Sequence, residues 1–420
     1  MATQTKNIVI LGGGVIGLSI AYYAQARGFG VTILDRAPEE KEGCSFGNAG
    51  MVVPSHFIPL AAPGMMALGL KWMWNPESPF YVKPRLSLDL LKWGWQFWKS
   101  ATAAKVKAAA PILRDLHLTS RAEYEKFAAE LGNEFELVTR GLAMLCKTQK
   151  SLDEEAHMSE KAHELGVPAE VMDRAALAKL DPDITMDVIG GVYFPKDCHL
   201  SPNRFMAALR KSIVKQGGRI VYQAEAKSWR REGRRITALE TTQGNFQADE
   251  FILAAGAWAD VTAHQLGLSI PLQAGKGYSL TLEQPRELPR ICSILTEARI
   301  AVTPMGNTLR FGGTMEMSGL HERIDSRRVR GIIKSVPFYF PRFKEADFEG
   351  LKPWQGLRPC SPDGLPYIGR TKKYDNLTIA AGHAMMGLSL APVTGRLVSE
   401  ILTSEKPSVA LDLLAADRFA

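Results

Sequence analysis

Apolar runs and a helical periodicity alternate along the first 35 residues of the chain. Residues 7–11 (NIVIL) form an apolar, β-branched run, which predicts a buried strand. A helical pattern follows over residues 18–27, and residues 30–34 (GVTIL) predict a second strand that ends at Asp35. Gly28 stands between them as a helix stop. This strand–helix–strand opening predicts an α/β layer built on a parallel sheet.

Similar apolar runs return later in the chain, together with a second kind of pattern. Residues 219–223, 250–254 and 377–381 each predict a further strand. Segments 266–283 and 291–316 instead alternate apolar and polar residues at period two, which is typical of an antiparallel sheet with one solvated face. The chain therefore interleaves a parallel α/β layer with an antiparallel-sheet α+β unit.

The turn after the first predicted strand carries the pattern G-x-G-x-x-G, at Gly12, Gly14 and Gly17. The first glycine permits a tight turn, the second lets the backbone approach a pyrophosphate, and the third lets helix and strand pack closely. The helix N-terminus offers free N–H groups to phosphates, and Asp35 can accept hydrogen bonds from a ribose diol. This context predicts dinucleotide binding in a Rossmann-like domain; a glycine-rich turn without a ligand is the alternative.

Two further loops favour FAD over NAD as the dinucleotide. Residues 44–50 (CSFGNAG) form a small, polar loop that is suited to wrapping a pyrophosphate with backbone and hydroxyl donors. Residues 382–387 (GHAMMG) lead from a predicted strand into a helix, whose N-terminal end would support negative charge on a reduced flavin ring.

Composition changes this picture little. The chain has 420 residues, of which 46% are apolar and 23% charged, as in an ordinary globular protein with two domains. Five cysteines without CxxC spacing exclude a disulfide framework and the common zinc signatures, and they predict a reducing compartment and no metal site. No apolar stretch is long enough to span a membrane, and six residues, MATQTK, precede the first strand, so we expect a protein of the cytosolic side.

Five longer segments carry a resemblance to a known family: VILGGGVIGLSIAYY, SFGNAGMVVPSHFIPLAAPG, GKGYSLTL, GLRPCSPDGLPYIGR and AGHAMMGLSLAPVTG. They are similar to the flavoprotein family of D-amino acid oxidase, glycine oxidase and sarcosine oxidase, most of all to its bacterial D-amino acid dehydrogenase branch. The resemblance spans the chain and implies FAD as cofactor. It also implies oxidative deamination of D-amino acids to 2-oxo acids and ammonia, with hydride transfer to the flavin and electrons passed to a membrane quinone or a similar acceptor.

The resemblance also implies which segments build each domain. We expect the FAD-binding domain at 1–85, 146–225, 246–262 and 350–420, and the substrate domain at 86–145, 226–245 and 263–349. The residues expected to contact the cofactor are Gly12, Gly14, Val15, Ile16, Gly17, Asp35, Arg36, Ser45, Asn48, Ala49, Gly50, Ala226, Gly256, Gly382, His383, Gly387 and Leu388. For His383 the resemblance favours a role in positioning the cofactor over acid–base catalysis.

Three residues are expected to act on the substrate. By motif, Arg358 corresponds to the family's substrate-binding arginine, and its planar fork suits a carboxylate; a surface arginine in a loop is the alternative. Tyr278 matches a tyrosine of the dehydrogenases and would add a hydroxyl to the same carboxylate, unless it packs in the core. His56 stands where the dehydrogenases carry tyrosine, so it either lines the pocket or is an ordinary loop histidine.

The departure at His56 leaves the exact substrate open. Cyclic or N-substituted amino acids (D-proline, hydroxy-D-proline, sarcosine or glycine) are the alternative substrates, with oxygen as an alternative acceptor. Sarcosine oxidases attach flavin covalently through a cysteine in the region of Cys360. The sequence around Cys360 follows the dehydrogenase and glycine oxidase pattern, so we expect non-covalent FAD and an inert thiol.

One segment is rich in tryptophan and positive charge. Residues 51–110 hold seven Lys and Arg against two acidic residues, a net charge of +5 out of +7 for the chain. This composition predicts a membrane-surface segment over 55–100, on the cytoplasmic side of the inner membrane; a helix pair with aromatic core residues is the alternative. A nucleic-acid partner would call for basic residues spread over the fold, so none is expected. The tryptophans are Trp72, Trp74, Trp93, Trp95 and Trp98.

Overall fold

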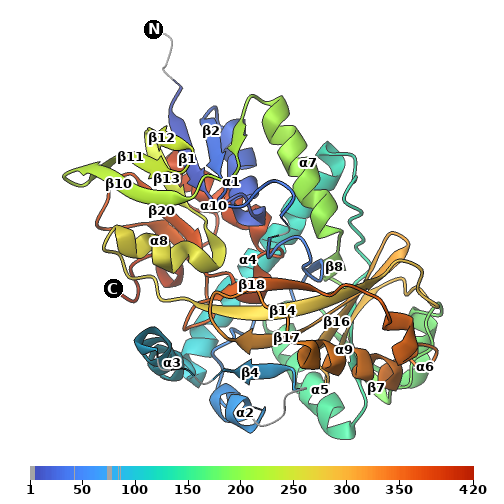
Figure 1. The fold of residues 1–420 in the computed structure, drawn as a ribbon. Coiled ribbons are helices and arrows are strands. Elements are labelled where there is room, and N and C mark those ends of the chain that lie inside the picture. The colour runs from blue at the N-terminus through green and yellow to red at the C-terminus, as the bar shows by residue number, and fades with distance from the viewer. Residues whose placement is uncertain (1–4, 42, 73–77, 84, 86) are drawn as a thin grey trace.

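The computed structural model describes residues 5–41, 43–72, 78–83, 85 and 87–420. A six-stranded sheet lies in the upper half of the molecule as drawn in Figure 1, with strand order β19-β20-β13-β1-β2-β9. Its neighbouring strands run parallel, apart from the antiparallel pair β19 and β20. The strands are β1 (Asn7–Leu11), β2 (Gly30–Leu34), β9 (Arg219–Val221), β13 (Glu250–Leu253), β19 (Tyr367–Arg370) and β20 (Leu377–Ala381).

Both faces of this sheet are buried, which is why its strands read as continuous apolar runs. Ile8 and Ile10 of β1 pack into a core with the helices α1, α4, α7 and α10, whereas Val9 and Leu11 pack into a separate core on the opposite face. That second face is covered by α8 and a small sheet of β10, β11 and β12. The elements are α1 (Val15–Ala26), α4 (Ala103–Glu130), α7 (Pro202–Lys215), α10 (Ala391–Leu402), α8 (Ala259–Gln265), β10 (Ala226–Glu232), β11 (Arg235–Thr241) and β12 (Gly244–Phe246).

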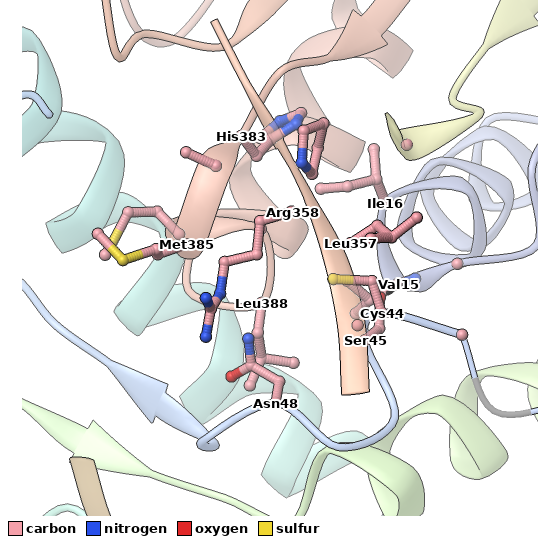
Figure 2. Close-up of a pocket in the computed structure, with 18 of the residues that line it drawn as sticks. Val15, Ile16, Cys44, Ser45, Asn48, Leu357, Arg358, His383, Met385 and Leu388 are labelled. Atoms are coloured by element: carbon pink, nitrogen blue, oxygen red, sulfur yellow. Dashed lines mark hydrogen bonds between the residues drawn. The ribbon is translucent and has the colours of Figure 1, made fainter. Parts of the chain in front are cut away.

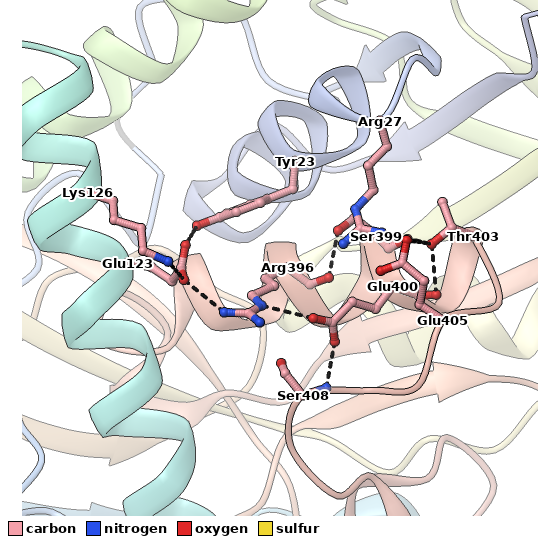
Figure 3. A network of polar contacts seen from close by, with 10 residues as sticks. All are labelled: Tyr23, Arg27, Glu123, Lys126, Arg396, Ser399, Glu400, Thr403, Glu405 and Ser408. Carbon is pink, nitrogen blue, oxygen red and sulfur yellow. Dashed lines mark hydrogen bonds and ion pairs between the residues drawn. The ribbon is translucent and has the colours of Figure 1, made fainter.

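A buried carboxylate ties three of these helices together (Figure 3). Glu123 of α4 accepts hydrogen bonds from the Tyr23 hydroxyl of α1 at 2.6 Å and from Arg396 of α10 at 3.0 Å. Lys126 donates to the same carboxylate at 2.7 Å, and Arg396 also reaches Glu400 at 2.9 Å. The network therefore holds α4 against the helices of the parallel sheet.

A nine-stranded sheet forms the second unit, in the order β18-β14-β17-β16-β15-β5-β7-β6, with β4 paired to β17. It is antiparallel apart from the parallel pairs β15 with β5 and β17 with β4. Helices α5, α6 and α9 belong to this unit. Its elements are β4 (Phe80–Val82), β5 (Leu142–Cys146), β6 (Glu170–Asp173), β7 (Gly190–Phe194), β14 (Gln273–Leu282), β15 (Cys292–Leu295), β16 (Ile300–Met305), β17 (Thr308–Met317), β18 (Trp354–Cys360), α5 (Gln149–Glu164), α6 (Arg174–Leu180) and α9 (Ser326–Tyr339).

The remaining elements are short or connect the two units. Helix α3 lies at the lower left of Figure 1, at the edge of the molecule. None of the described helices combines the length and the apolar character that a membrane crossing requires. These elements are α2 (Met65–Trp72), α3 (Leu88–Ser100), β3 (Met51–Val52), β8 (Cys198–His199), η1 (Gly256–Trp258), η2 (Glu345–Phe348), η3 (Ala384–Met386) and η4 (Asp412–Leu414).

The predicted fold class, a Rossmann-like layer interleaved with an antiparallel-sheet unit, is confirmed, but several predicted domain boundaries are wrong. Strands β4, β6, β7 and β18, expected in the FAD-binding domain, join the nine-stranded sheet. Conversely, α4 and the strands β10 and β11, expected in the substrate domain, pack on the six-stranded sheet. Strand pairing and core contacts link segments far apart in the chain, and a local pattern cannot specify such partners.

Candidate active site

One cavity of about 570 Å³ lies between the two sheets. The parallel strands β1, β2, β13 and β20 all end at it, because the carboxyl ends of parallel strands share one edge of the sheet. The opposite wall comes from β14, β17 and β18 of the nine-stranded sheet. The predicted site residues that line it are Gly12, Gly14, Val15, Ile16, Asp35, Arg36, Ser45, Asn48, Ala49, His56, Ala226, Gly256, Tyr278, Arg358, His383, Gly387 and Leu388.

Three predicted cofactor contacts lie behind this wall instead of on it. An added Cβ would stand 1.9 Å from the Gly12 carbonyl oxygen at Gly17, 2.2 Å from the Leu200 oxygen at Gly50, and 2.8 Å from the Tyr367 ring at Gly382. These glycines are not among the residues that line the cavity, and each has a packing role; their contact with a cofactor stays a prediction. They let neighbouring backbone approach closely enough to form the wall.

The glycine turn leaves room at the position where a phosphate is expected. Gly14 is the N-cap of α1, and a Cβ placed there would meet only the Ser45 hydroxyl, at 3.6 Å. That hydroxyl accepts the Val15 N–H at 3.2 Å, so the loop 44–50 is joined to the first turn of the helix. The first turn holds no acidic residue that would compete with an anion for the helix N-terminus.

Asp35 lies at the end of β2 and is fixed by backbone donors. Its two carboxylate oxygens accept the Gly13 N–H at 2.7 Å and the Ala37 N–H at 2.8 Å. A carboxylate offers about four acceptor positions, so capacity remains for a diol. Next to it, the Arg36 guanidinium stacks 3.7 Å above the Trp258 ring. The sequence did not reveal this pairing, because Trp258 follows β13, more than two hundred residues later.

The nine-stranded sheet clamps the loop 44–50 from the other side. Arg310 of β17 donates to the Asn48 carbonyl at 2.9 Å, and the Ser279 hydroxyl of β14 donates to the Gly47 carbonyl at 3.0 Å. At Gly47 an added Cβ would lie 2.1 Å from the ring of Trp354, which is why this position has no side chain. The predicted cofactor loop is therefore held between helix α1 and the nine-stranded sheet.

Arg358 extends from β18 into the cavity, toward the part where Asn48, Met385 and Leu388 are also drawn (Figure 2). Its Nη1 donates to the Thr314 carbonyl oxygen at 2.7 Å. Among the described residues no carboxylate lies within ion-pair distance of this guanidinium. Burial lowers the pKa of Arg358, yet a guanidinium stays charged in proteins. The site therefore holds a positive charge on the cavity wall, and its remaining donors suit an anion.

A β-bulge in β17 aims the Thr314 carbonyl at Arg358. The pairing of β14 with β17 shifts register between Lys276–Glu316 and Tyr278–Gly313, so that an extra residue of β17 is accommodated. Thr314 takes a left-handed backbone with φ of 63°, which is strained for a β-branched residue. Strain of this kind gathers at functional sites, and Thr314 also lines the cavity. No sequence signal marked this residue.

The structure corrects the expected role of Tyr278. Its hydroxyl donates to Glu316 at 2.8 Å and accepts the Asp325 N–H at 3.2 Å, and the side chain is 1% exposed. Neighbouring residues of a strand point to opposite faces, and the Arg358 guanidinium packs against Gly277, on the other face of β14. Tyr278 therefore borders the cavity, but its ring packs in the core and its hydroxyl is bound to Glu316 and Asp325, not directed at a ligand of Arg358.

His383 sits at the start of the loop after β20 and is neutral. Burial lowers its pKa to about 3. Its Nε2 lies 3.0 Å from the Thr394 hydroxyl, which itself donates to the Leu390 carbonyl at 2.8 Å. The single hydroxyl proton is thus used, so His383 Nε2 must be the donor. This fixed, neutral ring fits a positioning role better than acid–base catalysis.

Comparison with known proteins identifies the family. Residues 7–401 match the family described as DAO, FAD dependent oxidoreductase. The chain belongs to this family. A D-amino acid dehydrogenase of Granulibacter bethesdensis is 32% identical over 420 residues, covering 99% of this chain and 100% of that protein. A D-amino acid dehydrogenase of Bradyrhizobium diazoefficiens is 31% identical over 423 residues, covering 99% of both chains.

Solved structures show the same fold. Glycine oxidase from Geobacillus kaustophilus superposes with a TM-score of 0.79 at 24% identity, covering 99% of this chain and 100% of that chain. L-proline dehydrogenase from P. horikoshii superposes with a TM-score of 0.75 at 19% identity, covering 99% and 98%. The predicted resemblance and fold are thereby confirmed.

The residues present fit the family's cofactor. The glycine turn has open space at Gly14, and Asp35 retains acceptor capacity. The loop 44–50 is fixed by contacts from α1 and from the nine-stranded sheet. Within the described part of the chain, no group of three or more His, Cys, Asp and Glu side chains is placed to hold a metal ion. The lining of the cavity therefore fits a dinucleotide, and the cavity continues to Arg358.

Proposed function

We propose that this oxidoreductase is a dehydrogenase of free D-amino acids, which releases a 2-oxo acid and ammonia. The observation that carries the proposal is Arg358, a half-buried guanidinium without a carboxylate partner among the described residues, in the cavity that Gly12 and Gly14 also line. The relatives named D-amino acid dehydrogenase, which match over their full length, support the substrate class. FAD, when bound, accepts the hydride that leaves the substrate Cα.

The chain's own residues then bind, orient and shield the substrate. Arg358 receives the α-carboxylate in a two-pronged contact, while the Thr314 carbonyl keeps the guanidinium from rotating away. Met385 and Leu388 lie on the same side of β18 as the guanidinium, where they offer apolar contacts to the substrate side chain (Figure 2). The product imine is hydrolysed by water.

A substrate panel tests this proposal. The purified yellow protein is mixed without oxygen with D-amino acids, their L-enantiomers, D-proline, hydroxy-D-proline, sarcosine and glycine, and the loss of oxidised-flavin absorbance is followed. We expect D-amino acids with a primary amine to reduce the flavin fastest. If secondary amines reduce the flavin faster, cyclic or N-substituted amino acids are the substrate class instead. If no amino acid reduces the flavin, the proposed function is wrong.

We further propose that the FAD is held non-covalently. Cys360 is fully buried and does not line the cavity, and its thiol donates to the Arg358 carbonyl at 3.6 Å. Cys44 does line the cavity, but burial raises its pKa to about 11, so it is a thiol and a poor nucleophile at neutral pH. Acid precipitation should leave the flavin in the supernatant; flavin in the pellet would contradict this.

We also propose that the protein works at the cytoplasmic face of the inner membrane and passes electrons to a quinone. Trp95 and Trp98 of α3 are 55% and 56% exposed and stack on each other, with Lys99 5.0 Å from the Trp95 ring. Leu88 and Leu91 extend this exposed apolar face. An aromatic and cationic helix face of this kind suits an anionic lipid surface.

The same helix shows why its tryptophans differ. Trp93 is buried, and its indole N–H donates to the Cys360 carbonyl at 2.9 Å. It is therefore an aromatic core residue, as the alternative to a membrane-surface segment predicted. Trp74 lies outside the described residues, and the side chain of Trp72 is likewise not described. The membrane proposal therefore rests on Trp95 and Trp98.

Vesicle binding and acceptor assays test the membrane proposal. Vesicles with anionic phospholipids should sediment the wild type, and replacing Trp95 and Trp98 together with Ser should release it without loss of dye-linked activity. Phe338 on α9, an aromatic residue that is 61% exposed, is the matched control, and Phe338→Ser should not change binding. Equal sedimentation of all three proteins would contradict the proposal, as would oxygen outcompeting a quinone as acceptor.

A further inference from the structure

A chain of hydrogen bonds leads from the cavity wall to a buried carboxylate. His56 lines the cavity, and its Nδ1 lies 2.9 Å from the Ser55 hydroxyl oxygen. That hydroxyl donates to Asp197 Oδ2 at 2.5 Å, and the Ser55 backbone N–H donates to Oδ1 at 3.0 Å. Asp197 lies in the turn between β7 and β8 and has 0% of its surface exposed.

The order of these groups fixes the proton positions. The single proton of the Ser55 hydroxyl is given to Asp197, so His56 Nδ1 must donate to Ser55. His56 Nε2 then carries the free lone pair, and no described residue makes a hydrogen bond to it. The arrangement differs from a Ser-His-Asp triad, in which histidine stands between the other two groups and takes the serine proton. Here Ser55 lies between His56 and Asp197, where its hydroxyl can pass a proton from one to the other and does not act as a nucleophile.

Asp197 is not held by a charge partner. No Lys or Arg of the described chain lies within ion-pair distance of it, and its side-chain oxygens receive hydrogen bonds from Ser55 alone. Burial raises the pKa of Asp197 to about 7. A buried carboxylate without a cation is costly in its charged form, so Asp197 can take up a proton readily near neutral pH.

The groups that face the relay do not titrate in this range. Burial and the charge of Arg299 lower the pKa of His56 to about 4, and burial lowers that of His117 to about 3. Burial also raises the thiol pKa of Cys198 to about 12, and that of Cys292 above its usual value. The elements packed around Asp197 and His56 contribute these groups and two permanent charges: His117 and Arg121 from α4, Cys198 from β8, Cys292 from β15, and Arg299 from the turn after β15.

We propose that His56, Ser55 and Asp197 form a proton relay that takes a proton from the ammonium group of an amino acid bound at Arg358. This inference rests on the proposed function. The ammonium N–H bond breaks as its proton binds His56 Nε2, the Nδ1 proton passes to Ser55, and the Ser55 proton passes to Asp197. The relay leaves a neutral amine and a neutral carboxylic acid, and no electrons move.

The relay has a clear chemical purpose. A protonated amine has no lone pair with which to assist departure of hydride from the neighbouring carbon, and most free amino acid carries a protonated amine at pH 7. The relay thus prepares the reactive form of the amine inside the cavity, next to the substrate carbon. His56 touches the substrate in this scheme, whereas Ser55 and Asp197 act through it and are positioning residues.

Flavin reduction measured against pH tests the relay. In anaerobic stopped-flow experiments with the holoenzyme and D-alanine, Asp197→Asn should slow reduction at pH 7 by roughly 100-fold, the lower end of what a positioned proton acceptor contributes. The loss should shrink steadily at high pH, where solution supplies the free amine. Ser55→Ala should behave in the same way, while Ser55→Thr keeps a hydroxyl and should recover most of the rate.

Two measurements separate the relay from a structural role and from the proposed function. In the holoenzyme, the infrared band of a protonated carboxyl group should disappear with a midpoint near pH 7 and be missing from Asp197→Asn. Asp181→Asn is the matched control, because Asp181 is also a buried carboxylate, bound to the Arg290 and Ile291 N–H groups away from the cavity. It should leave the pH profile unchanged.

The outcomes are distinct. The relay is wrong, and the proposed function stands, in either of two cases. In the first, Asp197→Asn and Ser55→Ala each slow flavin reduction by the same factor at every pH. In the second, the wild type lacks the infrared carboxyl band that titrates near pH 7. If no amino acid reduces the wild-type flavin at any pH, the proposed function is wrong and the relay falls with it.

Discussion

The six-stranded and the nine-stranded sheet contribute different kinds of groups to the cavity wall. On the six-stranded side the wall is largely backbone: the glycine turn and the first turn of α1, with Asp35 and Ser45 bound to backbone N–H groups. On the nine-stranded side the wall presents a charged side chain, Arg358. The strained bulge that contains Thr314 holds this side chain in place through the Thr314 carbonyl. A pyrophosphate is recognised by N–H groups that neighbouring residues supply, whereas a substrate carboxylate needs a guanidinium that distant strands must place.

The largest effects are expected at the glycines of the six-stranded side. Gly17→Val should prevent folding, because even a Cβ would lie 1.9 Å from the Gly12 oxygen. Gly14→Val should fold but lose its flavin, because its Cβ has space and the side chain then blocks phosphate approach. Circular dichroism reports the fold and visible absorbance reports the flavin. A yellow Gly14→Val protein would mean that the backbone cradle lies elsewhere.

On the nine-stranded side, the Arg358→Ala variant should still bind flavin but should turn over amino acids much less efficiently. Hydrogen bonds to a charged group contribute roughly 1.5–3 kcal/mol, and a stranded carboxylate costs more, so kcat/KM should fall about ten- to several-hundredfold. Arg358→Lys should recover only part of the loss, because an ammonium lacks the planar fork.

An amine without a carboxylate is the control substrate for Arg358. It should react poorly with every variant, and its residual rate should change much less than the rate with amino acids. If wild type and Arg358→Ala show the same preference for the carboxylated substrate, the carboxylate is bound elsewhere.

A smaller effect, on stability, is expected behind the six-stranded sheet. Burial alone would raise the pKa of Glu123, but hydrogen bonds from Lys126, Tyr23 and Arg396 lower it below its usual value. A lowered folded-state pKa stabilises the protein above the unfolded pKa, and this contribution is lost as the pH falls through the folded value. Glu123→Gln should therefore cost about 2 kcal/mol at pH 7 and progressively less below about pH 4.

An exposed ion pair just beyond the C-terminal ends of α1 and α10 is the control for Glu123. Glu405 is 53% exposed and pairs with Arg27, so Glu405→Gln should change stability by less than about 0.5 kcal/mol (Figure 3). Urea unfolding at pH 7 and pH 4 measures both variants. Equal costs for the two substitutions would show that burial of the network adds nothing.

The smallest effect is expected at the bulge of the nine-stranded side. Thr314→Gly keeps the carbonyl that holds Arg358 and relieves a left-handed β-branched residue, so it should stabilise the protein by about 1 kcal/mol after the entropy cost of glycine. KM for amino acids should stay near that of the wild type. Thr303→Gly, at a buried threonine of β16, should destabilise instead. Thermal unfolding that ranks the two variants the other way would show that Thr314 is not strained.

The sequence alone determined the local parts of this protein. Strands at 7–11, 30–34 and 377–381 appear with the predicted bounds, because each is an apolar run buried on both faces. Gly12, Gly14 and most of the loop 44–50 line the cavity, since their chemistry depends on neighbours in the chain. Motif resemblance also placed Arg358 in this cavity, although its contact with substrate stays a prediction.

Only the tertiary structure decided what depends on partners far apart in the sequence. Strand β18 pairs with β14 and so brings Arg358 beside Thr314, while the alternation along β14 turns Tyr278 away. The link from His56 to Asp197 spans about 140 residues and left no local pattern. Residues that act through local backbone geometry can be recognised from spacing, whereas residues that act through packing and strand register become visible only when the chain has folded.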